Sequence, residues 1–335
     1  MNDVASQLPQ YELPLPWQRP LWLQINHSWK THRLPHAILL HGAAGLGKLL
    51  FAQWLAKALL CEAQSAELLP CGYCASCKLY QAGSHPDLVL ISPEENKQQI
   101  SVDQIRAANE RLGMTSARSG YRLAIIEPAH QMTVAAANGL LKTLEEPGQR
   151  SLIILVTAQP SAMLPTIRSR CQQMGMATPS TQAAQDWLEQ QIGKPVSPEL
   201  LAFACGAPLR ALEYTQGRFD ALRESMSPGL QALTEGGGEI TQMAQSWADE
   251  QLPERLSWLD GWMTVRIRRE ILRTADPVTR ESLQSAAQVL NISALFQALD
   301  RLRELKAQLR RTALQRELAL ETVLLMMQRA LNTRN

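Results

Sequence analysis

One glycine-rich loop constrains the fold of this chain more than any other feature of its sequence. The segment Gly42-Ala43-Ala44-Gly45-Leu46-Gly47-Lys48 has the form G-x-x-x-x-G-K. It follows an apolar run at residues 36–40 and precedes a stretch at residues 48–60 with the length and composition of a helix. A strand, such a loop and a helix form a phosphate-binding unit, in which backbone N–H groups, the helix N-terminus and a lysine face the phosphates. The candidate residues for binding nucleotide phosphate are Gly42, Gly45, Gly47 and Lys48.

Apolar runs alternate with helical patterns along the first half of the chain. Runs that predict buried strands occupy residues 36–40, 87–91, 122–127 and 151–157. Helical patterns lie between them at residues 102–112 and 133–144, and Ser101 is the expected N-cap of the first. Near-continuous apolar strands separated by helices are typical of a parallel sheet covered on both faces. We therefore expect an α/β module with a parallel sheet that extends to about residue 177.

Two positions that an ATPase of this type needs are altered. The lysine of the loop is ordinarily followed by a Ser or Thr that holds Mg²⁺, but here the next residue is Leu49. A later strand ordinarily ends in Asp-Glu, whereas residues 123–126 are followed by Glu127 and Pro128. Pro128 cannot activate water, and Glu127 is either a remaining metal-side carboxylate or a solvated acid at a strand end. We expect no hydrolysis at this loop, and the residues leave open whether it binds ATP or ADP or only keeps the geometry of the fold.

A short insertion at residues 61–77 concentrates cysteines. Its members are Cys61, Cys71, Cys74 and Cys77. Two C-x-x-C spacings without a histidine favour a closed, structural Zn²⁺ site with four thiolate ligands. An iron–sulfur cluster is a weaker interpretation, because the residues after Cys77 lack the fourth cysteine and the proline of the ferredoxin pattern, and free buried thiols are the remaining alternative. Cys205 stands apart from the cluster and is expected in the core.

From about residue 178 the sequence predicts helices only. We expect a small helical unit at residues 178–217 and a larger helical domain at residues 218–335. Apolar side chains at intervals of three and four predict one long amphipathic helix from about residue 293 to 331, and its markers are Leu299, Leu302, Leu305 and Leu309. Arginines and lysines gather at residues 266–273 and 301–316. They are either contacts for DNA phosphate or solvated helix faces, and the second interpretation is favoured.

Composition limits the classes of function. The chain has 335 residues, a formal net charge of +2 and 19% charged residues, which excludes binding of nucleic acid through overall charge alone. No segment has the length and apolar character of a membrane span, and the first residues lack the apolar core of a signal peptide. We expect a cytoplasmic protein with reduced or metal-bound cysteines.

Two further motifs complete a resemblance to a known family. Residues 136–147 read AANGLLKTLEEP, and residues 164–171 read LPTIRSRC. Together with the glycine-rich loop and the cysteine insertion, in this order, they resemble the clamp-loader subunits gamma, tau and delta-prime of bacterial DNA polymerase III, which are AAA+ proteins. The resemblance covers about residues 36–171. It implies that the α/β module is RecA-like, that residues 178–217 form a helical lid and that residues 218–335 form a helical oligomerisation domain. Leu49 and Pro128 make the chain more similar to delta-prime than to gamma or tau, which resemble working ATPases.

The resemblance implies roles for individual residues. Arg170 would be an arginine finger that reaches the ATP of a neighbouring subunit, with Arg168 as a weaker candidate, and a surface ion pair is the alternative for Arg170. Thr157 stands where an active relative senses the γ-phosphate, and Arg210 lies one position late for a sensor arginine. Cys171 is expected to pack under the turn that carries Arg170.

The resemblance also implies partners. The chain would act as a stator beside gamma or tau and delta subunits in the nucleoid-associated replisome, and would meet the sliding clamp and primer–template DNA through the complex. It would not be catalytic alone. Two other functions compete with this one. A gamma-like ATPase predicts Mg²⁺-dependent hydrolysis by the isolated chain, and a zinc-dependent DNA-binding module predicts tight, salt-sensitive binding of DNA by the isolated chain.

Overall fold

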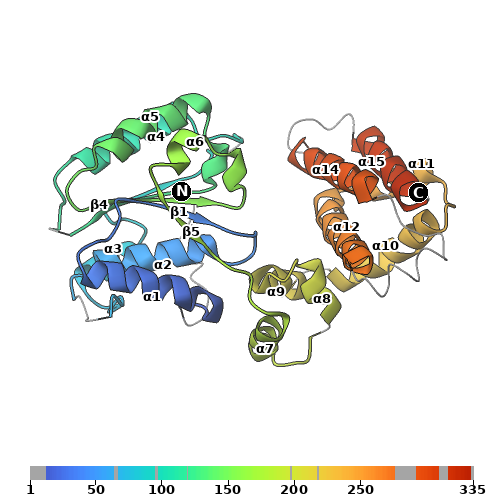
Figure 1. The fold of residues 1–335 in the computed structure, drawn as a ribbon, viewed down its shortest axis with the longest axis horizontal. Helices are drawn as coiled ribbons and strands as arrows, with labels where there is room; N and C mark the ends of the chain where they lie inside the picture. Colours follow the sequence, from blue (N-terminus) through green and yellow to red (C-terminus); the bar gives the residue numbers. More distant parts are fainter. Residues whose placement is uncertain are drawn as a thin grey trace. The chain divides into compact units, whose positions relative to one another are not determined.

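The chain forms two compact units, Met1–Pro179 and Ser180–Asn335, of which the first is α/β and the second is helical (Figure 1). The computed structural model describes residues 13–63, 67–94, 97–118, 120–196, 198–216, 219–275, 292–308 and 316–332. The division of the second unit into a lid and an oligomerisation domain near residue 217 stays a prediction.

A five-stranded parallel sheet forms the centre of the first unit, with the strand order β2-β3-β4-β1-β5. Its strands are β1 (Ala37–His41), β2 (Leu88–Ile91), β3 (Arg122–Ile126), β4 (Ser151–Thr157) and β5 (Gln172–Gly175). The central strands β3 and β4 are buried along their whole length, which explains their continuous apolar sequences. Strand β5 was not predicted from the sequence, because this edge strand buries only Met174 and carries two glutamines and a glycine.

Helices cover both faces of this sheet (Figure 1). On one side lie α1 (Arg19–Lys30), α2 (Lys48–Leu60) and α3 (Ala75–Gln81), and on the other α4 (Val102–Gly113), α5 (Val134–Glu145) and α6 (Pro165–Arg168). The predicted N-cap of α4 is confirmed: the Ser101 side chain accepts from the Gln104 backbone N–H, and the Gln104 side chain accepts from the Ser101 N–H. No helix in the described part of the chain is long and apolar enough to span a membrane.

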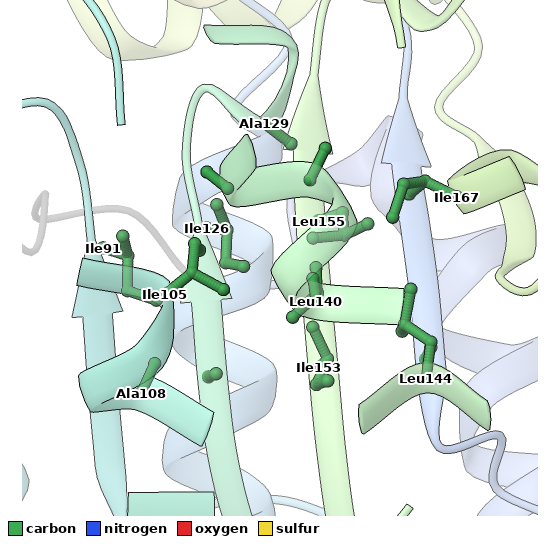
Figure 2. Close-up of a cluster of buried hydrophobic side chains, with 14 of the residues drawn as sticks. Ile91, Ile105, Ala108, Ile126, Ala129, Leu140, Leu144, Ile153, Leu155 and Ile167 are labelled. Atoms are coloured by element: carbon green, nitrogen blue, oxygen red, sulfur yellow. The ribbon is translucent and has the colours of Figure 1, made fainter. Parts of the chain in front are cut away.

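One buried cluster packs α4, α5 and α6 against the sheet (Figure 2). The strands contribute Ile91, Ile126, Ile153 and Leu155, and the helices contribute Ile105, Ala108, Leu140, Leu144 and Ile167. Fully burying one leucine or isoleucine side chain stabilises a fold by about 1.5–3 kcal/mol. Ile167 and Cys171 belong to this cluster, so the turn between them, which carries Arg170, is anchored at both ends. The expectation that Cys171 packs under this turn is confirmed.

The regular elements among the described residues of the second unit are all helices, as the sequence predicted. Its helices are α7 (Thr181–Ile192), α8 (Pro198–Phe203), α9 (Pro208–Gln216), α10 (Phe219–Thr234), α11 (Ile240–Trp247), α12 (Leu252–Ala275), α14 (Ile292–Gln308) and α15 (Arg316–Asn332).

Two expectations for this unit were wrong. The single helix expected over residues 293–331 is two helices, α14 and α15, which pack against each other. Its markers Leu299, Leu302 and Leu305 are buried, and Leu309 lies outside the described residues. Apolar residues keep the helical spacing in both helices, and this spacing alone does not distinguish one long helix from two shorter ones. Cys205 is half-buried rather than in the core, and its φ of 55° places it in a turn that follows α8.

Candidate functional site

The glycines of the G-x-x-x-x-G-K loop are required by its backbone. Gly42 has a φ of +146°, and a Cβ atom there would lie 2.6 Å from the carbonyl oxygen of Met176. Gly45 and Gly47 have φ values of 79° and 77°, in the left-handed region that favours glycine. Gly47 is the N-cap of α2, so the loop delivers the chain directly to the helix N-terminus. The structure therefore brings together the predicted loop glycines and Lys48 between β1 and α2.

Lys48 is held inside this loop. Its side chain is buried, and its Nζ donates to the carbonyl oxygen of Ala43 at 2.7 Å. Burial lowers the pKa of Lys48, and the charge of Glu127 partly opposes that shift. Burial likewise raises the pKa of Glu127, and Lys48 opposes it. Glu127 is half-buried and its charge acts on Lys48, while Leu49 offers no oxygen to a metal ion.

The end of β4 carries the next polar group. Thr157 is buried, and its hydroxyl oxygen lies 2.9 Å from Nδ1 of His130 and accepts from the Gln159 backbone N–H at 2.9 Å. Burial, and then the charge of Lys48, lower the pKa of His130. His130 was not among the residues predicted from the sequence, although it follows the carboxyl end of β3, where functional side chains gather in open α/β sheets.

Two residues from the N-terminal side of the first unit also contact the loop. The indole N–H of Trp17 donates to the Leu46 carbonyl oxygen at 2.9 Å. Nε2 of Gln18 lies 3.2 Å from the Leu46 carbonyl oxygen and 3.0 Å from that of Gly47, and donates to both. Gln18 is fully buried in the short 3₁₀ helix η2 (Pro16–Gln18). No local pattern indicates these contacts, because they join positions 28 or 29 residues apart.

The four cysteines of the insertion form one compact cluster. The Sγ atoms of Cys61, Cys71, Cys74 and Cys77 all lie within 4.8 Å of one another. The Cys61–Cys74 sulfur pair is 3.9 Å apart and the Cys71–Cys77 pair 4.0 Å. A tetrahedron with Zn–S bonds of about 2.3 Å has edges of about 3.8 Å. The donor set and its spacing therefore suit a metal ion and are compatible with zinc.

Backbone N–H groups surround these sulfur atoms. Cys61, Cys71 and Cys74 each accept from a backbone N–H at 3.3 Å, donated by Cys71, Cys74 and Cys77 respectively. Burial on its own raises the pKa of the Cys74 thiol, but hydrogen bonds from the N–H groups of Cys77 and Glu62 lower it to about 6. Burial raises the pKa of the Cys61 and Cys77 thiols, so Cys74 is the most readily ionised of these three; the thiolate is the form that binds metal ions.

Arg170 lies on the outer side of the anchored turn. Its Nε and Nη2 lie 2.8 Å and 2.6 Å from Oε1 of Glu145, and its Nη1 donates to the Thr166 carbonyl oxygen at 3.0 Å. The side chains of Arg170 and Glu145 are 36% and 51% exposed. Arg168 differs, because its Nε is buried and has no hydrogen-bond partner among the described residues. Arg170 is therefore the better placed of the two to reach another molecule.

Arg210 is engaged within the second unit. Its Nε donates to the hydroxyl of Tyr214 at 2.9 Å, and its Nη2 lies 3.9 Å from Oδ2 of Asp260. Two residues of the C-terminal basic group are also in ion pairs, Arg301 with Glu304 and Arg303 with Asp260. Arg310 and Arg311, which belong to the same group, lie outside the described residues.

The parallel sheet, the glycine-rich loop and the all-helical second unit define an AAA+-type protein with a RecA-like core. A family model described as "DNA polymerase III, delta subunit" matches residues 17–180, and one described as "DNA polymerase III, delta subunit, C terminal" matches residues 218–329. The chain belongs to the DNA polymerase III subunit delta' family.

Three relatives illustrate this membership. The delta' subunit of Pseudomonas aeruginosa is 34% identical over 82% of this chain and 84% of its own length. The delta' subunit of Yersinia pestis is 32% identical over 95% of this chain and 96% of its own. The DNA polymerase III subunit tau of Escherichia coli is 30% identical over 71% of this chain, but this match spans only 35% of tau. The chain is thus similar to delta' over nearly its whole length and to tau over part of it.

Proposed function

We propose that this chain is a clamp-loader subunit that does not hydrolyse ATP itself and supplies Arg170 to the ATP of a neighbouring subunit. One combination carries the proposal: Leu49 and Pro128 replace the groups that bind magnesium and activate water, while an arginine stays exposed on a rigid turn. In this role the chain is a stator, against which ATP-binding subunits move.

The glycine-rich loop supports the first half of the proposal. Lys48 donates to a carbonyl of its own loop, and Thr157 is hydrogen-bonded to His130. Both side chains are therefore engaged inside the chain, and Leu49 provides no metal ligand beside them. Without a bound metal ion, most of the charge stabilisation that phosphoryl transfer requires is lost.

The contacts of Arg170 support the second half. Glu145 and Thr166 engage at most three of the five N–H donors of the Arg170 guanidinium, so two donors remain for a phosphate while Glu145 holds the side chain. A guanidinium is planar and always charged, and it matches phosphate oxygens with several donors at once. An arginine finger of this kind contributes about 10³–10⁵ in rate at the site that it reaches.

The partners in this proposal are gamma or tau and delta subunits in the cytoplasm. The similarity to delta' and tau subunits of DNA polymerase III supports a place in one complex. Through that complex the chain would take part in loading the sliding clamp onto primed DNA. The four clustered cysteines would hold one structural Zn²⁺, which supplies folding energy rather than chemistry.

The test is a reconstitution of the complex with gamma or tau and delta subunits. Arg170→Ala should leave assembly intact and lower DNA-stimulated ATP turnover and clamp loading, and Arg170→Lys should not restore them, because lysine lacks the planar fork. Arg106→Ala is the matched control, since Arg106 is another exposed arginine in an ion pair, with Asp103. Unchanged turnover with Arg170→Ala would reject the finger.

The isolated chain separates the competing functions. Steady Mg²⁺-dependent ATP hydrolysis by the purified chain would favour an independent ATPase. Tight, salt-sensitive binding of DNA by the chain alone would favour a DNA-binding module. Metal analysis should find one zinc ion per chain, and Cys74→Ser should lose it; a folded wild-type chain without metal would reject the zinc site.

A further inference from the structure

A buried hydrogen bond joins the two arms of the cysteine cluster. Cys61 lies at the end of α2, and the other three cysteines lie in the turn and first residues of α3. The hydroxyl of Ser76, between Cys74 and Cys77, donates to the carbonyl oxygen of Leu60 at 2.6 Å. Leu60 directly precedes Cys61. This hydrogen bond therefore holds the end of α2, which carries Cys61, beside the segment that carries Cys71, Cys74 and Cys77.

His85 fixes the direction of this bond. Its Nδ1 accepts from the backbone N–H of Asp87 at 3.1 Å, so the proton of the neutral ring is on Nε2. Nε2 lies 2.6 Å from Oγ of Ser76 and donates to it, which leaves the hydroxyl hydrogen of Ser76 free to point at Leu60. Each group in this series of hydrogen bonds, from the Asp87 N–H to the Leu60 carbonyl, therefore has a defined role as donor or acceptor.

The side chains that make these hydrogen bonds are buried, so each bond matters for the stability of the fold. Ser76 is 0% exposed and His85 is 4% exposed. A buried polar group without a partner destabilises the fold, so neither side chain can easily exchange its bond for water. Burial also lowers the pKa of His85, which favours the neutral ring.

This series of hydrogen bonds ends at Asp87, beside the sheet of the first unit. Asp87 directly precedes β2, and its carboxylate accepts from the Ala117 backbone N–H at 2.9 Å and from the Ser116 hydroxyl at 3.3 Å. His85 therefore connects the cysteine insertion to a segment whose position is fixed by the core.

We propose that Ser76 and His85 are positioning residues that bring Cys61 to the turn of Cys71, Cys74 and Cys77 before the metal ion binds. This inference rests on the proposed zinc site. Cys61 and Cys71 are ten residues apart, and ordering such a segment costs conformational entropy. The Ser76–Leu60 bond fixes the Cys61 end of that segment in advance, so that less ordering remains when the ion binds. Hydrogen bonds behind metal ligands typically change metal affinity by about 10–100-fold.

Tyr80 provides a matched control from the same helix. Its hydroxyl donates to the carbonyl oxygen of Gln53 at 2.8 Å, so it also joins α3 to α2. Gln53 lies in the interior of α2, away from the end that carries Cys61. Tyr80→Phe therefore removes one hydrogen bond between α2 and α3 and leaves the series of hydrogen bonds from Asp87 to Leu60 intact.

The experiment measures Zn²⁺ affinity and release in the full-length chain by competition with a chromophoric chelator. Ser76→Ala and His85→Leu should each weaken Zn²⁺ binding by about 10–100-fold and speed its release. Tyr80→Phe should bind Zn²⁺ as the wild type does. His85→Gln, whose amide N–H can still donate to Ser76, should lie between the wild type and His85→Leu. The spectrum of bound Co²⁺ should stay that of a tetrahedral four-thiolate site in every variant that folds.

The outcomes are distinguishable. A wild-type chain that binds Zn²⁺ while Ser76→Ala and His85→Leu bind it equally well would overturn this inference and leave the zinc site standing. An equal loss in Tyr80→Phe would also overturn it, because the effect would then belong to any bond between α2 and α3. A wild-type chain without affinity for Zn²⁺ would overturn the zinc site and this inference together. If Ser76→Ala does not fold, His85→Gln against His85→Leu gives the same comparison.

Discussion

Glu145 and Arg170, 25 residues apart, meet through a single carboxylate oxygen: Oε1 of Glu145 lies 2.8 Å from Nε and 2.6 Å from Nη2 of Arg170. Glu145 is the last residue of α5, and Arg170 follows α6. This ion pair therefore joins the motif at residues 136–147 to the motif at residues 164–171. Because the second oxygen of Glu145 makes none of these contacts, the pair is weaker than a two-oxygen, two-nitrogen fork.

This pairing predicts an effect of Glu145 on the proposed arginine finger. Glu145→Gln should change the free energy of unfolding by less than about 1 kcal/mol, because the ion pair is exposed. It should lower ATP turnover of the reconstituted complex, but less than Arg170→Ala does, since Thr166 still orients the guanidinium. Glu146→Gln, at the neighbouring exposed position, should match the wild type. Equal turnover with Glu145→Gln and the wild type would show that this carboxylate does not position Arg170.

A second prediction concerns the glycine-rich loop. Leu49→Thr supplies the hydroxyl that a magnesium ion needs, yet the isolated chain should still release no phosphate from ATP. Pro128 offers no carboxylate for water, and Lys48 remains bonded to Ala43. The measurement is phosphate release with excess Mg²⁺, with Leu49→Thr/Pro128→Glu as the comparison. Steady turnover by Leu49→Thr alone would show that Pro128 is not the limiting loss.

The sequence was sufficient for the parts of this fold that local pattern controls. The buried strands β1, β3 and β4 have continuous apolar sequences because both faces of the sheet are covered, and the cysteine spacing predicted a cluster that the structure contains. The edge strand β5 has no such signal, because one buried methionine among polar residues predicts neither a strand nor a helix.

The contacts that complete the candidate site were not predictable in the same way. Trp17, Gln18 and His130 act through partners 27–29 residues away, and no local period or motif encodes such a distance. The resemblance implied that Arg170 acts on a neighbouring subunit, with a surface ion pair as the alternative, and only the folded chain identifies Glu145 as its ion-pair partner.

Asp260 provides a third prediction, in the second unit. Its carboxylate is shared by Arg303, at 3.0 Å, and Arg210, at 3.9 Å. Burial, and then Arg210, lower the pKa of nearby Lys306, and Asp260 opposes that shift. Asp260→Asn should therefore lower the free energy of unfolding by about 2 kcal/mol, because it removes the negative charge that Arg210 and Arg303 share. Urea unfolding checks this, with the exposed Asp300→Asn as control; equal midpoints for both variants would contradict it.

His130 gives a prediction for pH. Burial, and then Lys48, hold its native pKa below 6.5, so the unfolded chain binds more protons between the native pKa and 6.5. The free energy of unfolding should therefore rise with pH across that window and be fully retained above it. His130→Gln should flatten this rise, while His85, whose pKa is lowered in the same direction, maintains a smaller one. Urea unfolding between about pH 5 and pH 8 measures the slope; an unchanged slope in His130→Gln would contradict the assignment.

The last prediction compares two residues that hold the glycine-rich loop. Trp17→Phe removes one donor from the Leu46 carbonyl, which still accepts from Gln18, so the cost should be about 1 kcal/mol. Gln18→Met removes both donations to the loop and also the acceptor of the buried Leu15 N–H.

The two variants therefore differ in what they leave unpaired. The Gly47 carbonyl still accepts from the Phe51 N–H and the Leu46 carbonyl from Trp17, so the orphaned Leu15 N–H is the main penalty of Gln18→Met. That variant should lose about 2–3 kcal/mol and exchange the amide hydrogens of the loop faster than Trp17→Phe does. Urea unfolding and hydrogen exchange over residues 42–48 provide the comparison. Equal losses in both variants would mean that the indole ring, rather than the bonds of Gln18, fixes the loop.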